Sequence, residues 1–162
     1  SLFCDDHIPG GSGTVIIDPP EGDMAAYLAS LDRLKSEPVE TLFPAHGSPQ
    51  GGAMRRVEGL IRHRLAREAR VLAALAVGAG AGGEPGATRG GGAGKVAGGG
   101  RSAATGRSAR AARSLDQLVE IAYADTPKEL WPYAERSLLA HLLKLEAEGR
   151  AKRQGRGWAA AG

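Results

Sequence analysis

Residues 78–113 constrain the fold of this chain more than any other segment, because they offer almost nothing that a hydrophobic core could use. Gly, Ala, Ser, Thr and Arg dominate the segment, and Val96 is its only large aliphatic residue. Such a composition cannot bury enough apolar surface to offset the entropy of ordering the backbone. We therefore predict a disordered, positively charged linker that separates two folding segments, residues 1–77 and 114–162.

The formal net charge of +3 comes from this linker. Residues 1–77 carry 8 Lys/Arg and 10 Asp/Glu, residues 78–113 carry 6 and 1, and residues 114–162 carry 7 and 7. A basic arm that binds RNA is the alternative to a flexible spacer. The two flanking segments are not basic overall, so net charge alone does not indicate a nucleic-acid-binding domain.

Three further features bound the setting of the protein. No apolar run approaches the roughly 20 residues of a membrane-spanning helix, so we expect no membrane partner. The single Cys4, which we interpret as a small buried hydrophobe rather than a reactive thiolate, favours an intracellular setting, cytoplasmic or in an organelle matrix. The chain begins with Ser1 at what resembles the end of a buried strand, so we expect a fragment whose targeting region is not visible.

The first segment has the pattern of an α/β fold. Residues 14–17 indicate a strand or extended segment, and residues 40–44 a short apolar strand that ends just before His46. Apolar residues at helical spacing predict helices over residues 24–34 and 53–75, the second with an Arg-rich polar face.

The second segment has the pattern of a winged helix. Ser114 and Gln117 form a capping box that begins a helix, a short helix near residues 128–131 is interrupted by Pro132, and a third helix runs over residues 134–148. Residues 150–159 then predict two short strands around a Gly-containing turn. Three helices followed by a basic hairpin make a small α+β winged-helix domain.

Asp6 and His46 are the residues that point to chemistry. Each stands where a predicted strand gives way to a loop, the usual place for a fold to present ligands. Carboxylate and imidazole both bind zinc, and a carboxylate can bridge two cations. The alternative is structural: Asp6 caps a turn and His46 is an ordinary loop histidine.

Short stretches of this sequence resemble a known family. Residues 3–8, FCDDHI, are similar to the F-T-G-D-H-I strand end of the metallo-β-lactamase superfamily, and residues 43–47, FPAHG, to its P-G-H-G motif. Residues 61–68, IRHRLARE, resemble a subgroup that contains an endoribonuclease and carries a winged-helix domain after the hydrolase fold. The resemblance implies that residues 1–77 are the C-terminal half of an αββα sandwich.

The resemblance also implies roles for the ligands. Asp6 corresponds to the aspartate that bridges two zinc ions in the complete enzyme, and His46 to a histidine of the second zinc ion. A zinc-bound hydroxide would then attack the substrate. The family's H-x-H-x-D-H motif is absent, so we expect the fragment alone to be inactive. Asp5 replaces the family's usual Gly, which predicts strain if the turn needs a positive φ angle.

Other residues are candidates for substrate contact. Arg64 and Arg67 could meet a phosphate-bearing substrate, although we interpret them first as a solvated helix face. Arg153 and Trp158 of the hairpin suit phosphate contact and base stacking, whereas the alternative packs Trp158 over the third helix. We interpret His7 as a loop residue and His141 as structural.

The most specific hypothesis is therefore a fragment of a dinuclear zinc hydrolase that acts on RNA, with single-stranded RNA as the partner. Two alternatives stay open: a thioester hydrolase of the glyoxalase II kind, and a non-catalytic winged-helix module on a degraded hydrolase half. The sequence does not indicate the oligomeric state.

Overall fold

The computed structural model describes residues 1–11, 13–77 and 112–162. The predicted disordered linker lies almost entirely outside the described residues. The elements, in chain order, are β1 (Leu2–Asp5), α1 (Met24–Leu34), β2 (Thr41–Pro44), β3 (Gln50–Gly51), α2 (Ala53–Ala76), α3 (Leu115–Ala122), the 3-10 turn η1 (Lys128–Leu130), α4 (Trp131–Ala147), β4 (Ala151–Gln154) and β5 (Gly157–Ala160).

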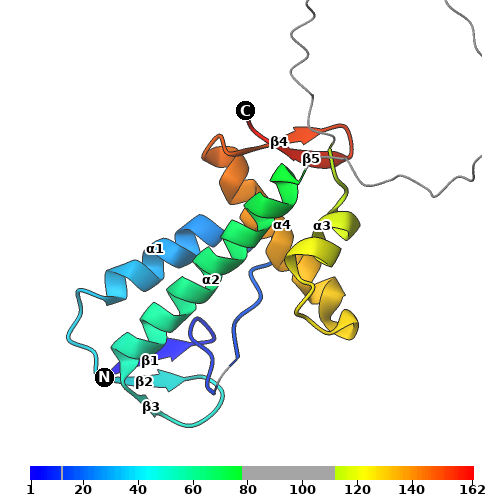
Figure 1. The fold of residues 1–162 in the computed structure, drawn as a ribbon. Coiled ribbons are helices and arrows are strands. Elements are labelled where there is room, and N and C mark those ends of the chain that lie inside the picture. Colours follow the sequence, from blue (N-terminus) through cyan, green and yellow to red (C-terminus); the bar gives the residue numbers. More distant parts are fainter. Residues whose placement is uncertain (12, 78–111) are drawn as a thin grey trace, which may run out of the picture.

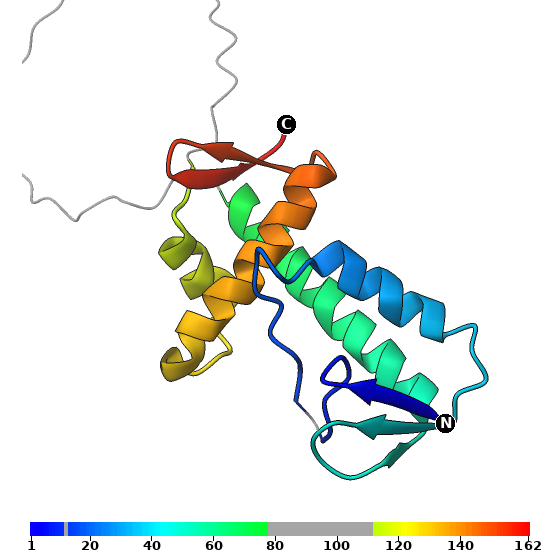
Figure 2. The ribbon, with the colours of Figure 1, turned by 180° about the vertical axis from the view of Figure 1, so that it is seen from behind.

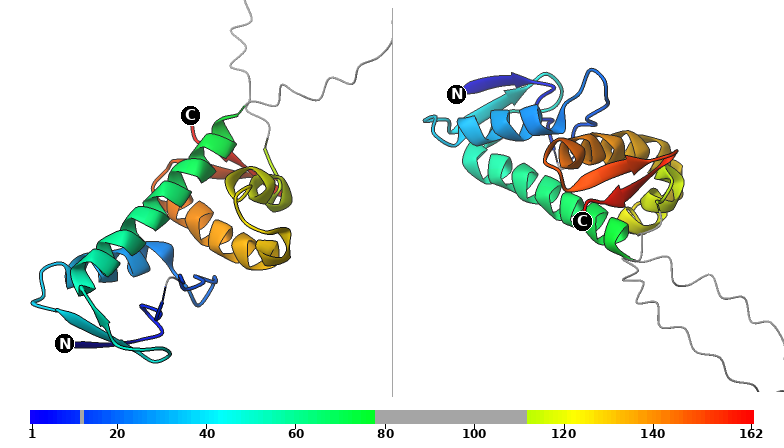
Figure 3. Two further views of the ribbon diagram at one scale, coloured as in Figure 1. Left: turned by 60° about the horizontal axis from the view of Figure 1, so that its bottom comes forward. Right: turned by 90° about the horizontal axis from the view of Figure 1, so that it is seen from above.

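Helix α2 runs through the middle of the molecule, from the three-stranded sheet to the β4–β5 hairpin (Figure 1). The sheet of β1, β2 and β3 lies at its N-terminal end, and the β4–β5 hairpin lies at its C-terminal end. Seen from behind, α1 runs beside α2 while α4 packs across its C-terminal half (Figure 2). The two further views of Figure 3 show the same arrangement, with α3, α4 and the hairpin gathered at the C-terminal part of α2.

The small sheet places two loops at one edge. β1 pairs with β2 in parallel, with Leu2 opposite Leu42 and Asp5 opposite Pro44, and β3 adds an antiparallel edge. Parallel neighbours have their carboxyl ends on the same side. The loops that follow Asp5 and Pro44 therefore leave the sheet together.

Two hydrophobic cores stabilise the fold, and α2 contributes to both. One core lies under the sheet and α1, and it includes Val57 and Leu60 of α2 together with Ala140 of α4. The other lies within the winged-helix segment, and it includes Val71, Ala74 and Leu75 of α2. The helix thus joins the two predicted folding segments directly.

Four polar residues are buried among the described residues, and they gather between the two cores. Each of two helices contributes two of them, one helical turn apart: Arg64 and Glu68 on α2, and Ser137 and His141 on α4. The prediction that Arg64 belongs to a solvated face is wrong, because its side chain is only 3% exposed. The apolar periodicity of α2 did not reveal that its polar face also meets protein.

The winged-helix segment differs from its prediction at one point. Ser114 and Gln117 form the expected capping box. Pro132, however, does not interrupt a helix: it occupies the first turn of α4, where its missing N–H is no loss. The hairpin turns at Gly155, which has a φ angle of 58°, and Arg113 adds a bridge to Trp158 through backbone hydrogen bonds of 2.8 Å.

Residues 14–17 are the extended segment allowed by the sequence, without a place in a sheet. No described helix is long and apolar enough to cross a membrane.

Candidate metal site and the junction with the winged helix

The structure brings Asp6 and His46 together. The Oδ1 atom of Asp6 lies 3.8 Å from Nε2 of His46, and both side chains are largely exposed at the carboxyl edge of the sheet. The Asp5 carbonyl accepts a hydrogen bond of 3.1 Å from the Ala45 N–H, which links the two loops just before the ligands. Parallel pairing of β1 and β2 thus makes neighbours of residues 40 positions apart.

The turn before Asp6 has the unusual backbone expected from the sequence. Asp5 has a φ angle of 45° and is the non-glycine residue with positive φ among those described. Glycine adopts this region without the steric cost that a Cβ atom brings. Asp5 is therefore held in a strained backbone conformation directly before Asp6.

Two glycines let the loops approach. A Cβ atom on Gly10 would lie 2.5 Å from the His46 carbonyl oxygen, and Gly47 has a φ angle of 100°. Any larger residue at position 10 would push the His46 loop away. The close packing of these loops fixes where the imidazole stands.

The chemistry of this pair fits part of a zinc site. Ligands bound at about 2.0–2.2 Å to one zinc ion can lie up to about 4 Å apart, which includes the observed separation. Carboxylate oxygen and imidazole nitrogen are both zinc ligands. Within residues 1–11, 13–77 and 112–162 no group of three or more His, Cys, Asp or Glu side chains converges, so this pair supplies only a share of a coordination sphere.

His7 is held away from a ligand role by its neighbours. Its Nε2 lies 2.6 Å from Ser30 Oγ, whose own hydroxyl donates to the Tyr27 carbonyl at 2.7 Å. The serine proton is thus used, so the histidine N–H is the donor to Ser30. Burial lowers the pKa of His7, which keeps this ring neutral.

Cys4 behaves as the small hydrophobe that was expected. It is buried, its Sγ lies 3.5 Å from the Ile8 carbonyl, and burial raises the pKa of its thiol. A thiol with a raised pKa is a poor nucleophile.

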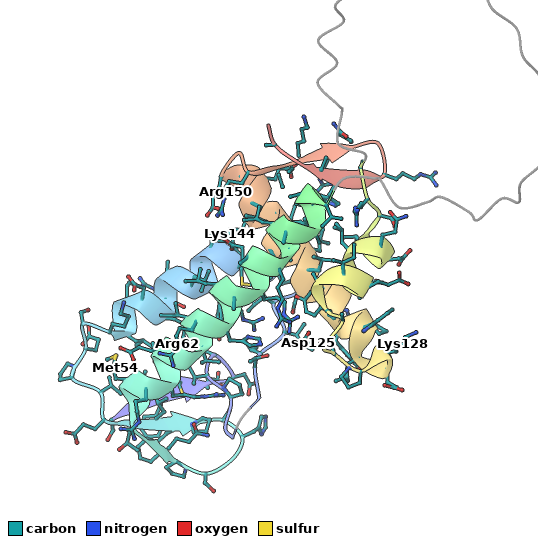
Figure 4. All side chains as sticks on the ribbon, viewed as in Figure 1. Met54, Arg62, Asp125, Lys128, Lys144 and Arg150 are labelled. Atoms are coloured by element: carbon teal, nitrogen blue, oxygen red, sulfur yellow. The ribbon has the colours of Figure 1, made fainter. Side chains whose placement is uncertain are left out.

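Arg67 also works inside the fold rather than in solvent. Its guanidinium donates to the Ala122 carbonyl at 2.6 Å and to the Asp125 carboxylate at 2.8 Å, and it lies 4.2 Å from the centre of the Tyr123 ring. Arg70 pairs with the same carboxylate. The two arginines thereby tie α2 to the loop after α3, and Figure 4 shows Asp125 at that loop.

The two hairpin residues predicted to contact substrate differ in their exposure to solvent. Trp158 is 4% exposed and packs in the second core, so the alternative interpretation of this residue as a packing residue agrees with the structure. Arg153 remains exposed, with its guanidinium 4.8 Å from the indole centre and its Nε 3.5 Å from Glu146. Contact of Arg153 with a phosphate stays a prediction.

A buried ion cluster, which the sequence did not reveal, lies where α2 crosses α4. Glu68 accepts hydrogen bonds from Lys144 at 2.9 and 3.1 Å and from Arg150 at 3.2 Å, and Figure 4 shows both cations at the same end of α4. His141 Nδ1 lies 3.7 Å from the Glu68 carboxylate. The neighbouring imidazole and the Lys144 ammonium lower the pKa of Glu68 to about 2 despite its burial. An acidic residue on the predicted polar face of a helix carried no signal of this role.

Comparison with known proteins agrees with the fold. Residues 114–158 match the beta-lactamase associated winged helix domain. The chain is 26% identical over 152 residues to a beta-lactamase-like protein 2 homolog of Drosophila melanogaster, covering 94% of this chain and 40% of that protein.

Two solved structures have the same fold over 98% of this chain and 41% of theirs. A metallo-beta-lactamase family protein from Thermus thermophilus has a TM-score of 0.64 at 18% identity. A beta-lactamase domain protein from Burkholderia ambifaria has a TM-score of 0.66 at 22% identity. The chain spans about 40% of the length of the relatives it matches.

The chain therefore has a mixed α/β fold like that of these two solved structures, and the matches agree with the resemblance at residues 3–8 and 43–47. The match of residues 114–158 to a winged helix domain and the similarity to a beta-lactamase-like protein 2 homolog agree with the subgroup that the sequence resembles.

Proposed function

We propose that this chain forms part of a zinc-dependent hydrolase that cleaves RNA, with Asp6 and His46 as metal ligands. The carrying observation is their convergence to 3.8 Å on two loops that parallel strands and close-packed glycines hold together. Bound zinc would supply a Lewis acid at this edge of the sheet. The chain itself contributes the Asp6 carboxylate as a candidate bridge, the His46 Nε2 as a terminal ligand, and a fixed distance between them.

RNA is favoured over a thioester substrate by the winged-helix segment. Residues 114–158 match a domain that the thioester-hydrolase alternative does not call for. Lys152, Arg153 and Arg156 project exposed cations from its hairpin, and such groups suit a phosphate backbone.

The metal part of the proposal is tested on the chain itself. Zinc affinity is measured by calorimetric titration for the parent chain, for Asp6→Asn and for His46→Gln. Each substitution removes one ligand, so we expect at least a tenfold loss of affinity. Asp32→Asn, an exposed aspartate on α1, is the matched control and should bind as the parent does. Equal affinity in all four proteins would refute the assignment.

The substrate is tested separately, on the product of the complete reading frame with any sequence that precedes Ser1. Single-stranded RNA and a glutathione thioester are offered with and without chelator. Chelator-sensitive RNA cleavage that Asp6→Asn abolishes supports the proposal. Thioester turnover without RNA cleavage favours the glyoxalase II alternative, and no turnover of either substrate favours the non-catalytic module.

A further inference from the structure

A cleft of about 270 Å³ opens between the first segment and the winged helix. Its walls are the extended residues Thr14, Val15 and Ile16, the middle of α2, and the region from Tyr123 through η1 to the start of α4. Two of the four buried polar residues, Arg64 and Ser137, line this cleft.

Arg64 brings an uncompensated positive charge to this cleft. Its guanidinium donates to the Val15 carbonyl and lies 5.4 Å from the Tyr27 ring centre, but it forms no ion pair with any carboxylate of the described residues. Its Nε is buried and has no hydrogen-bond partner in the part of the chain that the structure describes. A buried cation without a counter-charge is costly, and an anion in the cleft would relieve that cost.

Tyr123 adds a second unpartnered donor in the same cleft. The residue is 6% exposed, and its hydroxyl has no hydrogen-bond partner among the described residues. Burial raises the pKa of Tyr123 to about 12, so the hydroxyl keeps its proton and can donate it. The Arg67 guanidinium lies 4.2 Å from the centre of this ring, and its own charge is paired with Asp125.

The rim of the cleft offers flat apolar surface beside these donors. Tyr133 is 50% exposed and Leu130 is 49% exposed, although both lie against the cleft. Exposed tyrosine is a common platform for a base, because stacking tolerates any base. A ligand that uses all of these features would carry both an oxyanion and a planar ring.

We propose that this cleft binds the phosphate group of a nucleotide, with the Arg64 guanidinium and the Tyr123 hydroxyl donating to its oxygens and Tyr133 contacting the base. The nucleotide is either free or part of an RNA strand, and in the second case the inference deepens the proposed function. Binding at the cleft requires neither metal nor cleavage.

The test is a calorimetric titration of the 162-residue chain, in excess chelator, with a 5′-mononucleotide, the corresponding nucleoside and inorganic phosphate. We expect the mononucleotide to bind at least tenfold more tightly than the nucleoside and more tightly than inorganic phosphate. A short single-stranded RNA distinguishes the source: tighter binding than the mononucleotide indicates an RNA phosphate, and equal binding a free nucleotide.

Matched variants locate the site. Tyr123→Phe removes only the hydroxyl and should weaken mononucleotide binding about fivefold, and Arg64→Lys, which keeps the charge but not the planar fork, about tenfold. Arg62→Lys changes an exposed arginine two positions away on the same helix and should have no effect (Figure 4).

Equal binding of nucleoside and mononucleotide, or unchanged binding in Tyr123→Phe and Arg64→Lys, would overturn the proposal. Zinc binding at Asp6 and His46 would be unaffected by that result, so the two proposals fail independently.

Discussion

The Glu68 carboxylate of α2 and the Lys144 ammonium of α4 form a nearly buried ion pair, with both carboxylate oxygens within 3.1 Å of the nitrogen. This pair stands between the two hydrophobic cores. Removing one member of such a pair leaves an uncompensated charge in a site that excludes water.

Glu68→Gln should therefore lower the free energy of unfolding by about 3 kcal/mol, because Lys144 and Arg150 lose their shared carboxylate. Urea unfolding followed by circular dichroism measures the change. Glu148→Gln alters a more exposed member of the same cluster and should cost less than about 1 kcal/mol. Equal costs for the two variants would contradict the buried role of Glu68.

Stability should fall as the pH drops from 7 toward 5.5. His141 is completely buried, neither ring nitrogen has a hydrogen-bond partner among the described residues, and burial lowers its pKa below the usual 6.5. The unfolded state then binds more protons than the folded state, so stability is lost as the pH falls below the unfolded pKa. His141→Gln should reduce this slope in urea unfolding measured at several pH values, and an unchanged slope would refute it.

A second loss of stability should follow at lower pH. The pKa of Glu68 is lowered to about 2, so its contribution is complete above its usual pKa of 4.5 and disappears as the pH falls from 4.5 toward 2. Acid unfolding of the parent chain should show this step, and Glu68→Gln should lack it. A step that persists in the variant would assign the loss to other carboxylates.

Asp5→Gly should stabilise the chain by about 0.5–1 kcal/mol, because glycine accepts the φ angle of 45° without the clash of a Cβ atom. Thermal unfolding monitored by calorimetry gives the difference. Asp5→Ala removes the carboxylate but keeps the Cβ atom, so it should not raise the melting temperature. A gain from alanine equal to that from glycine would attribute the effect to charge instead of backbone strain.

Asp125→Asn should lower the free energy of unfolding by about 1 kcal/mol, because Arg67 and Arg70 both pair with this half-exposed carboxylate. Both guanidinium groups lower the pKa of Asp125, with Arg67 the larger influence. Asp32→Asn breaks an exposed pair with Lys35 within α1 and should change stability by less than about 0.5 kcal/mol in the same urea titration. Similar values for the two variants would mean that Asp125 does not join α2 to the loop after α3.

The sequence predicted those features whose signals are local. The capping box at Ser114, the helices over residues 24–34 and 53–75, and the turn at Gly155 each depend on neighbours along the chain. The approach of Asp6 to His46 agrees with the resemblance of residues 3–8 and 43–47, which implies that both side chains serve one metal site. The parallel pairing of β1 and β2 is the physical reason, because parallel strands end at one edge.

The buried arginine and the ion cluster were not predictable in this way. Arg64 and Glu68 lie on the face of α2 that hydropathy assigns to solvent. Val15 and Tyr27 contact Arg64, whereas Lys144 and Arg150 contact Glu68. Tertiary packing between distant segments decides their environment, and a single sequence carries no local mark of it.

Because the single continuous helix α2 is embedded in both hydrophobic cores, it connects the metal-ligand loops rigidly to the hairpin. The hairpin therefore cannot reorient independently of the sheet while α2 stays packed in both cores. A force that reorients one end of α2 must also reorient the other end. The length of this helix therefore sets the distance from the hairpin to the metal-ligand loops.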